Sequence, residues 1–181
     1  MGIIKRKIIV NPDAKVNPVS AILASGFGAG YAPVASGTVG SLVALLVLFV
    51  PALRTYPTMG ALIAAGFIIG IYTSKDMMKK YGDDPSVVVI DEMVGMWITL
   101  FIILYPLGII DGWFQFLAAG IAFGTFRFFD IVKVPPCRYF DRQKTAFGVM
   151  MDDVIAGIYA GIVSMVILQI IILIVLVEGM R

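Results

Sequence analysis

One stretch of the chain, residues 87–110, limits what the protein can fold into, because two adjacent acids, Asp91 and Glu92, lie near the start of a long apolar run. A helix needs about 20 apolar residues to cross the ~30 Å hydrocarbon core of a bilayer, and this run is long enough. A charged side chain at that depth costs at least about 2.5 kcal/mol, so it normally lies beside a cation, a polar partner or water. The sequence therefore raises the question of what binds beside these two acids.

The composition indicates an integral membrane protein. Hydrophobic residues make up 60% of the 181 residues and charged residues 14%, against about 25% charged residues in a typical soluble domain. Together with residues 87–110, four apolar segments predict about five transmembrane helices, at 37–53, 59–73, 113–129 and 154–177. Residues 19–31 are too few to span and predict a short interfacial or re-entrant helix. We therefore expect an all-α polytopic membrane helical bundle, with residues 1–18 as a cytosolic N-terminal segment and residues 19–181 as a single transmembrane domain.

The basic residues predict which side of the membrane each helix end faces. If the N-terminus is cytosolic, every Lys and Arg except Arg54 and Arg181 falls on the cytosolic side, as the positive-inside rule requires. Of the acids, only Asp111 and Glu178 then fall on the other side. The net charge of +2, without a long run of like charges, gives no indication of a nucleic-acid partner.

Five acids are expected at one depth near the cytosolic face, because each lies near the cytosolic end of a predicted helix: Asp91, Glu92, Asp130, Asp152 and Asp153. Like charges in a low dielectric repel each other, so the ionised cluster requires a cation. The chain has no histidine and one cysteine, which excludes a structural zinc site and a His-based nucleophilic triad. Oxygen ligands favour Mg2+, Mn2+ or Ca2+, and Mg2+ is usual where a phosphate completes the coordination. The other interpretation is an ion-pair network that joins helix ends.

Basic residues accompany these acids. Arg127, Asp130 and Lys133 are spaced i, i+3, i+6, so Arg127 and Asp130 share a helix face. Arg127 stands among phenylalanines and needs an anionic partner, which is either Asp130 or a phosphate. The following loop contains further cations that we interpret as partners of lipid headgroups: Arg138, Arg142 and Lys144.

Two glycine- and hydroxyl-rich stretches precede the acids. The run Gly26 to Gly30 favours close packing or a turn over phosphate binding, because it lacks a preceding strand and a Lys-Ser/Thr ending. In the stretch 33–41, Ser36 or Thr38 is a candidate helix N-cap. The alternative is that this helix start presents N–H groups and hydroxyls to an anion. The sequence leaves both interpretations open.

Three pairs of glycines have the small-xxx-small spacing that lets transmembrane helices approach closely: Gly66/Gly70, Gly120/Gly124 and Gly157/Gly161. We expect all three pairs to lie at helix–helix contacts.

A carboxylate cluster with an arginine and a hard cation at a cytosolic membrane face indicates metal-assisted chemistry on a phosphate-bearing lipid. Five stretches then carry a specific resemblance. In order, they are residues 26–30 (GFGAG), 36–41 (SGTVGS), 89–98 (VIDEMVGMWI), 126–133 (FRFFDIVK) and 148–157 (GVMMDDVIAG). Together they resemble the phosphatidylglycerophosphatase A family.

This resemblance implies a Mg2+-dependent enzyme of the bacterial cytoplasmic (inner) membrane, with its active site facing the cytosol. The implied reaction is hydrolysis of phosphatidylglycerophosphate, an anionic phospholipid, to phosphatidylglycerol and inorganic phosphate in phospholipid biosynthesis. Residues 19–181 would form the catalytic domain. No feature of the sequence predicts an oligomeric state.

The resemblance carries over to individual residues as roles. The expected metal ligands are Asp91, Glu92, Asp152 and Asp153. The expected catalytic residues are Asp130, Arg127, Lys133 and Thr38, with Asp130 as ligand or general base and the two cations on the phosphoryl oxygens. Ser36 and Asp141 are the expected substrate-binding residues. Direct attack by water and an aspartyl-phosphate intermediate both remain open.

Two other classes of function compete with this interpretation. A small divalent-cation channel or transporter could use the same carboxylates, but it predicts acids along the whole membrane path rather than at one face. A catalytically inactive binding protein is disfavoured, because no charged position of the five stretches is missing.

Overall fold

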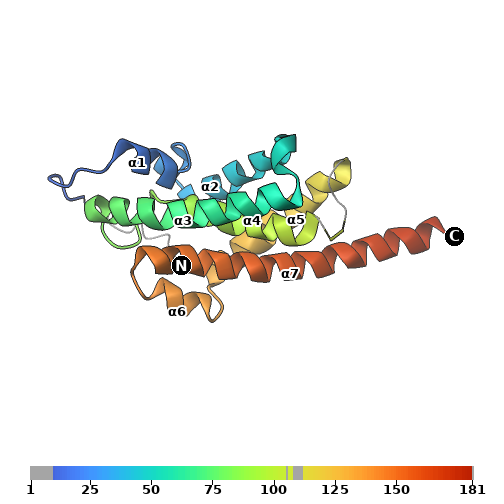
Figure 1. The fold of residues 1–181 in the computed structure, drawn as a ribbon. Coiled ribbons are helices and arrows are strands. Elements are labelled where there is room, and N and C mark those ends of the chain that lie inside the picture. Colours follow the sequence, from blue (N-terminus) through green and yellow to red (C-terminus); the bar gives the residue numbers. More distant parts are fainter. Residues whose placement is uncertain (1–9, 105, 108–111, 181) are drawn as a thin grey trace.

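The computed structural model describes residues 10–104, 106–107 and 112–180, and these residues form helices and connecting segments only (Figure 1). The α-helices are α1 (Pro18–Ala24), α2 (Ser36–Ala44), α3 (Tyr56–Tyr81), α4 (Ile90–Leu104), α5 (Trp113–Val132), α6 (Cys137–Asp141) and α7 (Ala146–Gly179). Three 3-10 helices join them: η1 (Ala29–Tyr31), η2 (Leu45–Phe49) and η3 (Pro51–Leu53). No strand occurs within these ranges, so the all-α prediction is confirmed.

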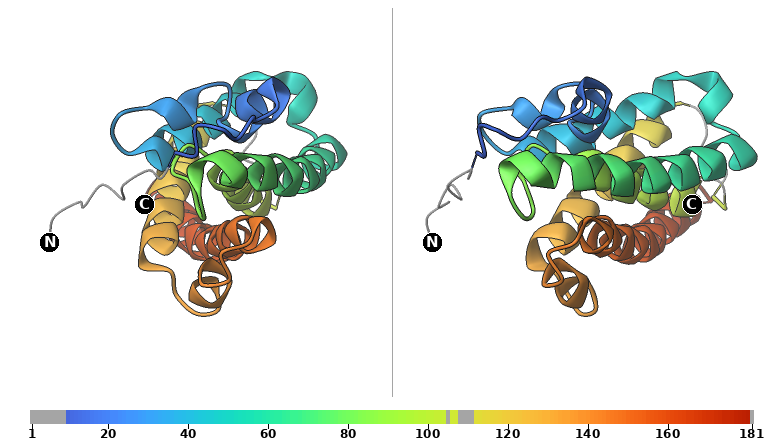
Figure 2. Two further views of the ribbon diagram at one scale, coloured as in Figure 1. Left: turned by 90° about the vertical axis from the view of Figure 1, so that its left-hand side faces the viewer. Right: turned by 60° about the vertical axis from the view of Figure 1, so that its left-hand side comes forward.

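Helix α4 lies at the centre of the bundle, where it contacts α2, α3, α5 and α7. Ten of its 15 residues are buried, which fits its sequence of almost uninterrupted apolar residues. Both views in Figure 2 place α1 and α2 (blue) and α6 and α7 (orange to red) on opposite sides of the bundle. Residues from both sides can therefore meet at the ends of α4.

Three helices are long and apolar enough to cross a membrane, namely α3, α5 and α7. Residues 36–49 form a shorter apolar helix, and α4 covers residues 90–104 of the run predicted at 87–110. Residues 105 and 108–110 of that run, Asp111, Arg181 and residues 1–9 of the predicted N-terminal segment lie outside the described residues. The described residues thus include three candidate membrane spans, which fits the prediction of a membrane protein.

The start of α7 differs from the sequence prediction. The helix begins at Ala146 rather than near residue 154, because Thr145 caps it by accepting a hydrogen bond from the N–H of Gly148. Asp152 and Asp153 are therefore the seventh and eighth residues of the helix, about two turns from its beginning. With 34 residues, α7 is about 51 Å long and extends beyond the other helices at its C-terminal end (Figure 1).

The short helix predicted near the N-terminus is present as α1, followed by η1. Asn17 caps α1 through the N–H of Val19, and its own N–H donates to Asp76 of α3 over 2.9 Å. Gly26 has φ +55°, and a Cβ at Gly30 would overlap the carbonyl of Val87. The packing and turn interpretation of the glycine run is therefore confirmed.

Two of the three glycine pairs lie at helix contacts, as predicted. A Cβ on Gly66 would come within 3.0 Å of Trp97, one on Gly70 within 2.5 Å of Met150, and one on Gly161 within 2.6 Å of Ile102. Gly157 packs against the backbone of Gly95 on α4. For Gly120 and Gly124 the prediction is wrong, because a Cβ at either residue would have no neighbour within 4 Å. That face of α5 is open, and the spacing alone could not reveal it.

Candidate active site

Three acids from two helices come together at one end of the bundle. Asp91 and Glu92 occupy the first turn of α4, and Asp153 lies in α7. One carboxylate oxygen from each lies within 4.8 Å of the others. Asp91 and Asp153 are only 8% and 3% exposed and Glu92 is half-buried, so the three carboxylates share a site with limited access to water. We call these residues the acidic trio.

The crossing of α4 and α7 brings the trio together. One turn beyond the acids, Gly95 of α4 and Gly157 of α7 meet without side chains between them. The hydroxyl of Thr99 donates to the carbonyl oxygens of both glycines, over 3.0 and 3.1 Å. This close contact fixes the distance between the two helices at the level of the trio.

The trio fits a divalent cation. Asp91 Oδ1 and Glu92 Oε2 are buried and have no hydrogen-bond partner among the described residues. Buried carboxylate oxygens are normally paired, because an unpaired one costs free energy comparable to a lost hydrogen bond. A set of carboxylate oxygens without nitrogen or sulfur is the donor set of Mg2+, Mn2+ or Ca2+. The trio is therefore a candidate metal centre.

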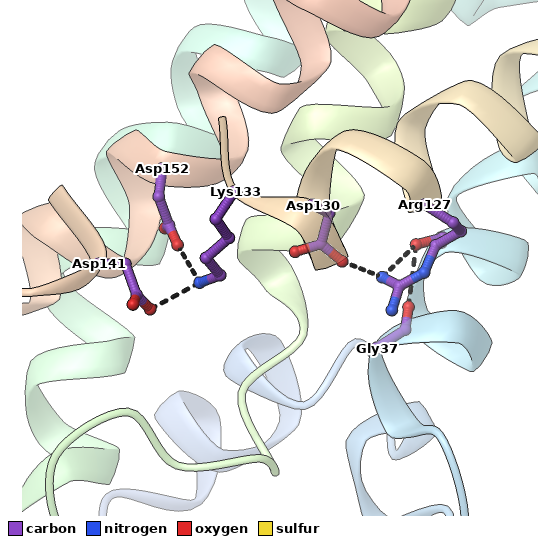
Figure 3. A network of polar contacts seen from close by, with 7 residues as sticks. Gly37, Arg127, Asp130, Lys133, Asp141 and Asp152 are labelled. Atoms are coloured by element: carbon purple, nitrogen blue, oxygen red, sulfur yellow. Dashed lines mark hydrogen bonds and ion pairs between the residues drawn. The ribbon is translucent and has the colours of Figure 1, made fainter. Parts of the chain in front are cut away.

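Asp152 takes part in an ion pair beside the trio. Its Oδ2 lies 2.5 Å from Lys133 Nζ, which also lies 2.6 Å from Asp141 Oδ1 (Figure 3). Successive side chains on a helix point about 100° apart, so Asp152 and Asp153 face different partners. Of the four acids predicted as metal ligands, three thus form one cluster and the fourth contacts a lysine.

Lys133 links α5, α6 and α7 through these contacts. It follows the last residue of α5 and has φ 50° and ψ 62°, in the left-handed region. Burial alone lowers the pKa of Lys133, but the charge of Asp152 and the hydrogen bonds to Asp141 and Asp152 outweigh burial and raise this pKa above its ordinary value. Lys133 is therefore a permanent cation beside the trio.

Arg127 forms the second cationic contact. Its Nη1 lies 2.6 Å from Asp130 Oδ2. Asp130 is therefore an anionic partner of Arg127, as one of the two interpretations of the sequence predicted. The same Nη1 donates to Ser41 Oγ on α2 over 3.4 Å, and Ser41 donates to the carbonyl of Gly37 over 2.9 Å. Figure 3 shows Arg127 between Asp130 and the start of α2, where Gly37 lies.

The start of α2 corrects one interpretation of the hydroxyl-rich stretch. The N-cap is Ala35, with φ +51° and no side-chain hydrogen bond, so neither Ser36 nor Thr38 caps the helix. Ser36 instead donates to the carbonyl of Ser86 over 2.6 Å and ties α2 to the segment before α4. Thr38 lies half-buried in the first turn. Sequence reasoning missed Gly37 and Ser41 as site residues, although their i, i+4 spacing was visible.

The three basic residues in the segment between Lys133 and α7 lie at the surface. Arg138 and Arg142 are exposed, and Lys144 lies 3.8 Å from Asp84 with both side chains accessible. Their interpretation as partners of lipid headgroups stays a prediction.

Comparison with known proteins identifies one matching family and several named relatives. Residues 22–168 match the family described as Phosphatidylglycerophosphatase A. The chain is 37% identical over 139 residues to the phosphatidylglycerophosphatase A of Escherichia coli (strain K12), covering 76% of each chain. It is 38% identical over 162 residues to the protein of the same name in Haemophilus influenzae, covering 84% of this chain and 92% of the relative.

A further relative carries a different name. The chain is 38% identical over 144 residues to a Bacteroides thetaiotaomicron protein named, in provisional terms, as a phosphatidylinositol-3-phosphatase, covering 77% of this chain and 87% of the relative. No solved structure gives a significant match.

Proposed function

Because this chain belongs to the phosphatidylglycerophosphatase A family it is a phosphatase, and we propose that it hydrolyses phosphatidylglycerophosphate to phosphatidylglycerol and inorganic phosphate. The observation that carries this proposal is the acidic trio, whose unpartnered oxygens lie beside the ion pairs of Arg127 and Lys133. A metal site beside the positively charged side chains of Arg127 and Lys133 is suited to a phosphate monoester, which carries negative charge on its terminal oxygens.

We assign the metal site to Asp91, Glu92 and Asp153, and we propose Mg2+ as the ion. Bound there, Mg2+ would polarise the phosphoryl group and offset negative charge as it develops in the transition state. Asp152 then has a separate task, because its contact with Lys133 holds that lysine beside the trio.

The protein's own residues bind and orient the substrate. Arg127 and Lys133 bind the phosphoryl oxygens, while Thr38 and the free N–H groups at the start of α2 add hydrogen-bond donors. Asp130 binds Arg127 through Oδ2, which leaves Oδ1 to accept a proton from the attacking water. The water oxygen bonds to phosphorus as its proton passes to Asp130, and the bond between phosphorus and the glycerol oxygen breaks. The released glycerol oxygen takes up a proton from solvent, and Asp130 returns its proton to solvent. Ser36 and Asp141 set the position of the headgroup through α2 and Lys133.

We propose a five-span topology in the bacterial inner membrane, in which α4 and the helix at residues 36–49 cross together with α3, α5 and α7. The site then faces the cytosol, and α1 and η1 lie at the interface. In this orientation Lys79, Lys80, Arg138 and Arg142 lie on the cytosolic side, in agreement with the positive-inside rule. Residues 19–181 form one catalytic domain that serves phospholipid biosynthesis.

The test is phosphate release by the purified protein from phosphatidylglycerophosphate, with Mg2+ or with EDTA. Phosphatidic acid and phosphatidylinositol 3-phosphate serve as comparison substrates, the second because of the name of one relative. We expect release only with a divalent cation, and fastest from phosphatidylglycerophosphate. Faster release from phosphatidylinositol 3-phosphate would overturn the headgroup assignment, and the absence of release from every lipid would overturn the function.

The competing function, a divalent-cation channel or transporter, requires acids along a path through the membrane. Within the described part of the chain, the buried acids Asp91, Asp152 and Asp153 lie at one end of the bundle. Magnesium flux into proteoliposomes, in the absence of phosphatase activity, would favour the channel.

Lys133→Met is expected to lower the rate of phosphate release by about 10²-fold, the scale seen when one transition-state donor is removed. Methionine has an unbranched side chain of similar length, but it leaves Asp141 and Asp152 without their shared cation. The matched control is Lys79→Met, which removes an exposed lysine paired with Asp76 over 2.9 Å. Exposed ion pairs contribute little to stability, so this control should stay folded and keep the wild-type rate. Equal rates for both variants would show that Lys133 has no role in the reaction.

A further inference from the structure

Ser41 is a buried hydroxyl in α2 that no functional role has so far explained. It is 0% exposed, and its proton is donated to the carbonyl of Gly37, one turn earlier in the same helix, over 2.9 Å. This backbone contact fixes the direction of the side chain. The oxygen lone pairs are then available to Arg127, whose Nη1 donates to Ser41 Oγ over 3.4 Å.

The guanidinium of Arg127 is consequently held by the protein through Nη1. Nη1 contacts both Asp130 and Ser41, whereas Nε is buried and has no partner among the described residues. Nearly all buried donors in proteins have a partner, so an unpaired N–H on a charged group indicates a ligand. Arginine binds phosphate through two parallel N–H groups on one edge of the guanidinium. With Nη1 committed, the edge formed by Nε and Nη2 is the one left for a phosphate.

The start of α2 also contacts the acidic trio. A Cβ on Gly37 would overlap Glu92 Oε1 and would lie 3.3 Å from Arg127 Nη1. Gly37 therefore lies between the cation and one member of the trio, close to both. The same helical turn that orients Ser41 thus sets the distance between Arg127 and the candidate metal centre.

We propose that Ser41 is a positioning residue, which together with Asp130 fixes Arg127 through Nη1 and so presents its Nε edge to the phosphoryl group of the substrate. This inference rests on the proposed phosphatase function and deepens it, because it assigns opposite ends of one guanidinium to the protein and to the substrate. Ser41 itself does not touch the substrate.

The first experiment compares Ser41→Ala with Ser164→Ala. Ser164 is an equally buried serine on α7. Its hydroxyl lies 2.6 Å from that of Thr125, which is on α5 like Arg127. Both variants lose one interhelical hydrogen bond to α5, so their thermal stabilities should fall by similar amounts. We expect Ser41→Ala to lower kcat by about tenfold, as for other residues that orient a functional group. Ser164→Ala should keep the wild-type kcat, and a wild-type kcat for Ser41→Ala would overturn the proposal.

A double-mutant cycle tests whether Ser41 acts through Arg127. Arg127→Lys keeps a positive charge but has no Nε edge to present, so Ser41→Ala should change kcat little when Arg127 is already lysine. An equal loss in both backgrounds would show that Ser41 acts independently of Arg127, and would overturn the proposal.

Binding of inorganic phosphate gives a readout that does not require turnover. Titration of the Mg2+-loaded protein with phosphate should show weaker binding for Ser41→Ala than for wild type and for Ser164→Ala. If the wild-type protein released no phosphate from any lipid, the proposed function would fail, while this titration would still test the inference. Unchanged phosphate binding in Ser41→Ala would overturn it.

Discussion

Asp153→Asn is expected to lower the rate of phosphate release by about 10³-fold or more, because each 1.36 kcal/mol of lost transition-state stabilisation is tenfold in rate and a catalytic metal supplies several kcal/mol. Asp153 is the only member of the acidic trio that comes from α7, so its loss leaves Asp91 and Glu92 as a two-residue site on α4. Asparagine keeps the size of the side chain and one oxygen, which limits the change to the charge.

Stability measurements separate loss of the metal from loss of the fold. Without Mg2+, Asp153→Asn should unfold at the same temperature as wild type or higher, because it replaces one of three crowded, buried carboxyl groups with a neutral amide. With Mg2+ at about 100 times its Kd, wild type should gain about 2.7 kcal/mol of stability, and the variant should gain much less.

The matched control is Glu178→Gln, which neutralises an exposed acid near the other end of α7. It should change neither the rate nor the response to Mg2+. If Asp153→Asn kept the wild-type rate of phosphate release, the trio would not be the active site, and the hydrolase mechanism proposed above would lose its metal centre.

Much of this site could be predicted from the sequence, since charged residues in apolar helices are conspicuous. Asp91, Glu92 and Asp153 stood out for that reason, and they form one cluster in the structure. The all-α fold followed from the same apolar runs. Where adjacent acids occurred, however, the sequence could not assign each to a partner, and Asp152 proved to contact Lys133 rather than the trio.

What the sequence could not predict depends on contacts between distant segments. Ser41 and Arg127 are 86 residues apart, and no local pattern joins them. Gly120 and Gly124 have the same spacing as Gly157 and Gly161, yet one pair faces open space and the other a neighbouring helix. A glycine pair permits close packing, but the partner surface decides whether packing occurs.

Gly157→Val is expected to destabilise the protein by at least about 3 kcal/mol, at the upper end of the range for overpacked sites. A Cβ at Gly157 would overlap the carbonyl oxygen of Gly95 and would lie 3.0 Å from the Cα of Gly95. Backbone cannot move aside as a flexible side chain can, so α4 and α7 must separate. The unfolding temperature in detergent measures this loss.

The matched control for that variant is Gly120→Val, where a Cβ has no neighbour within 4 Å. Valine has a higher helix propensity than glycine, so this variant should be as stable as wild type or slightly more so. Any folded fraction of Gly157→Val should also be nearly inactive, because a shift of 1 Å between reacting groups can cost about 10²-fold in rate. Separating the two helices at the glycines would also move the acids, since Gly157 lies one turn beyond Asp153 and Gly95 one turn beyond Asp91. If both glycine variants were equally stable and active, the contact between α4 and α7 would not be what holds the trio together.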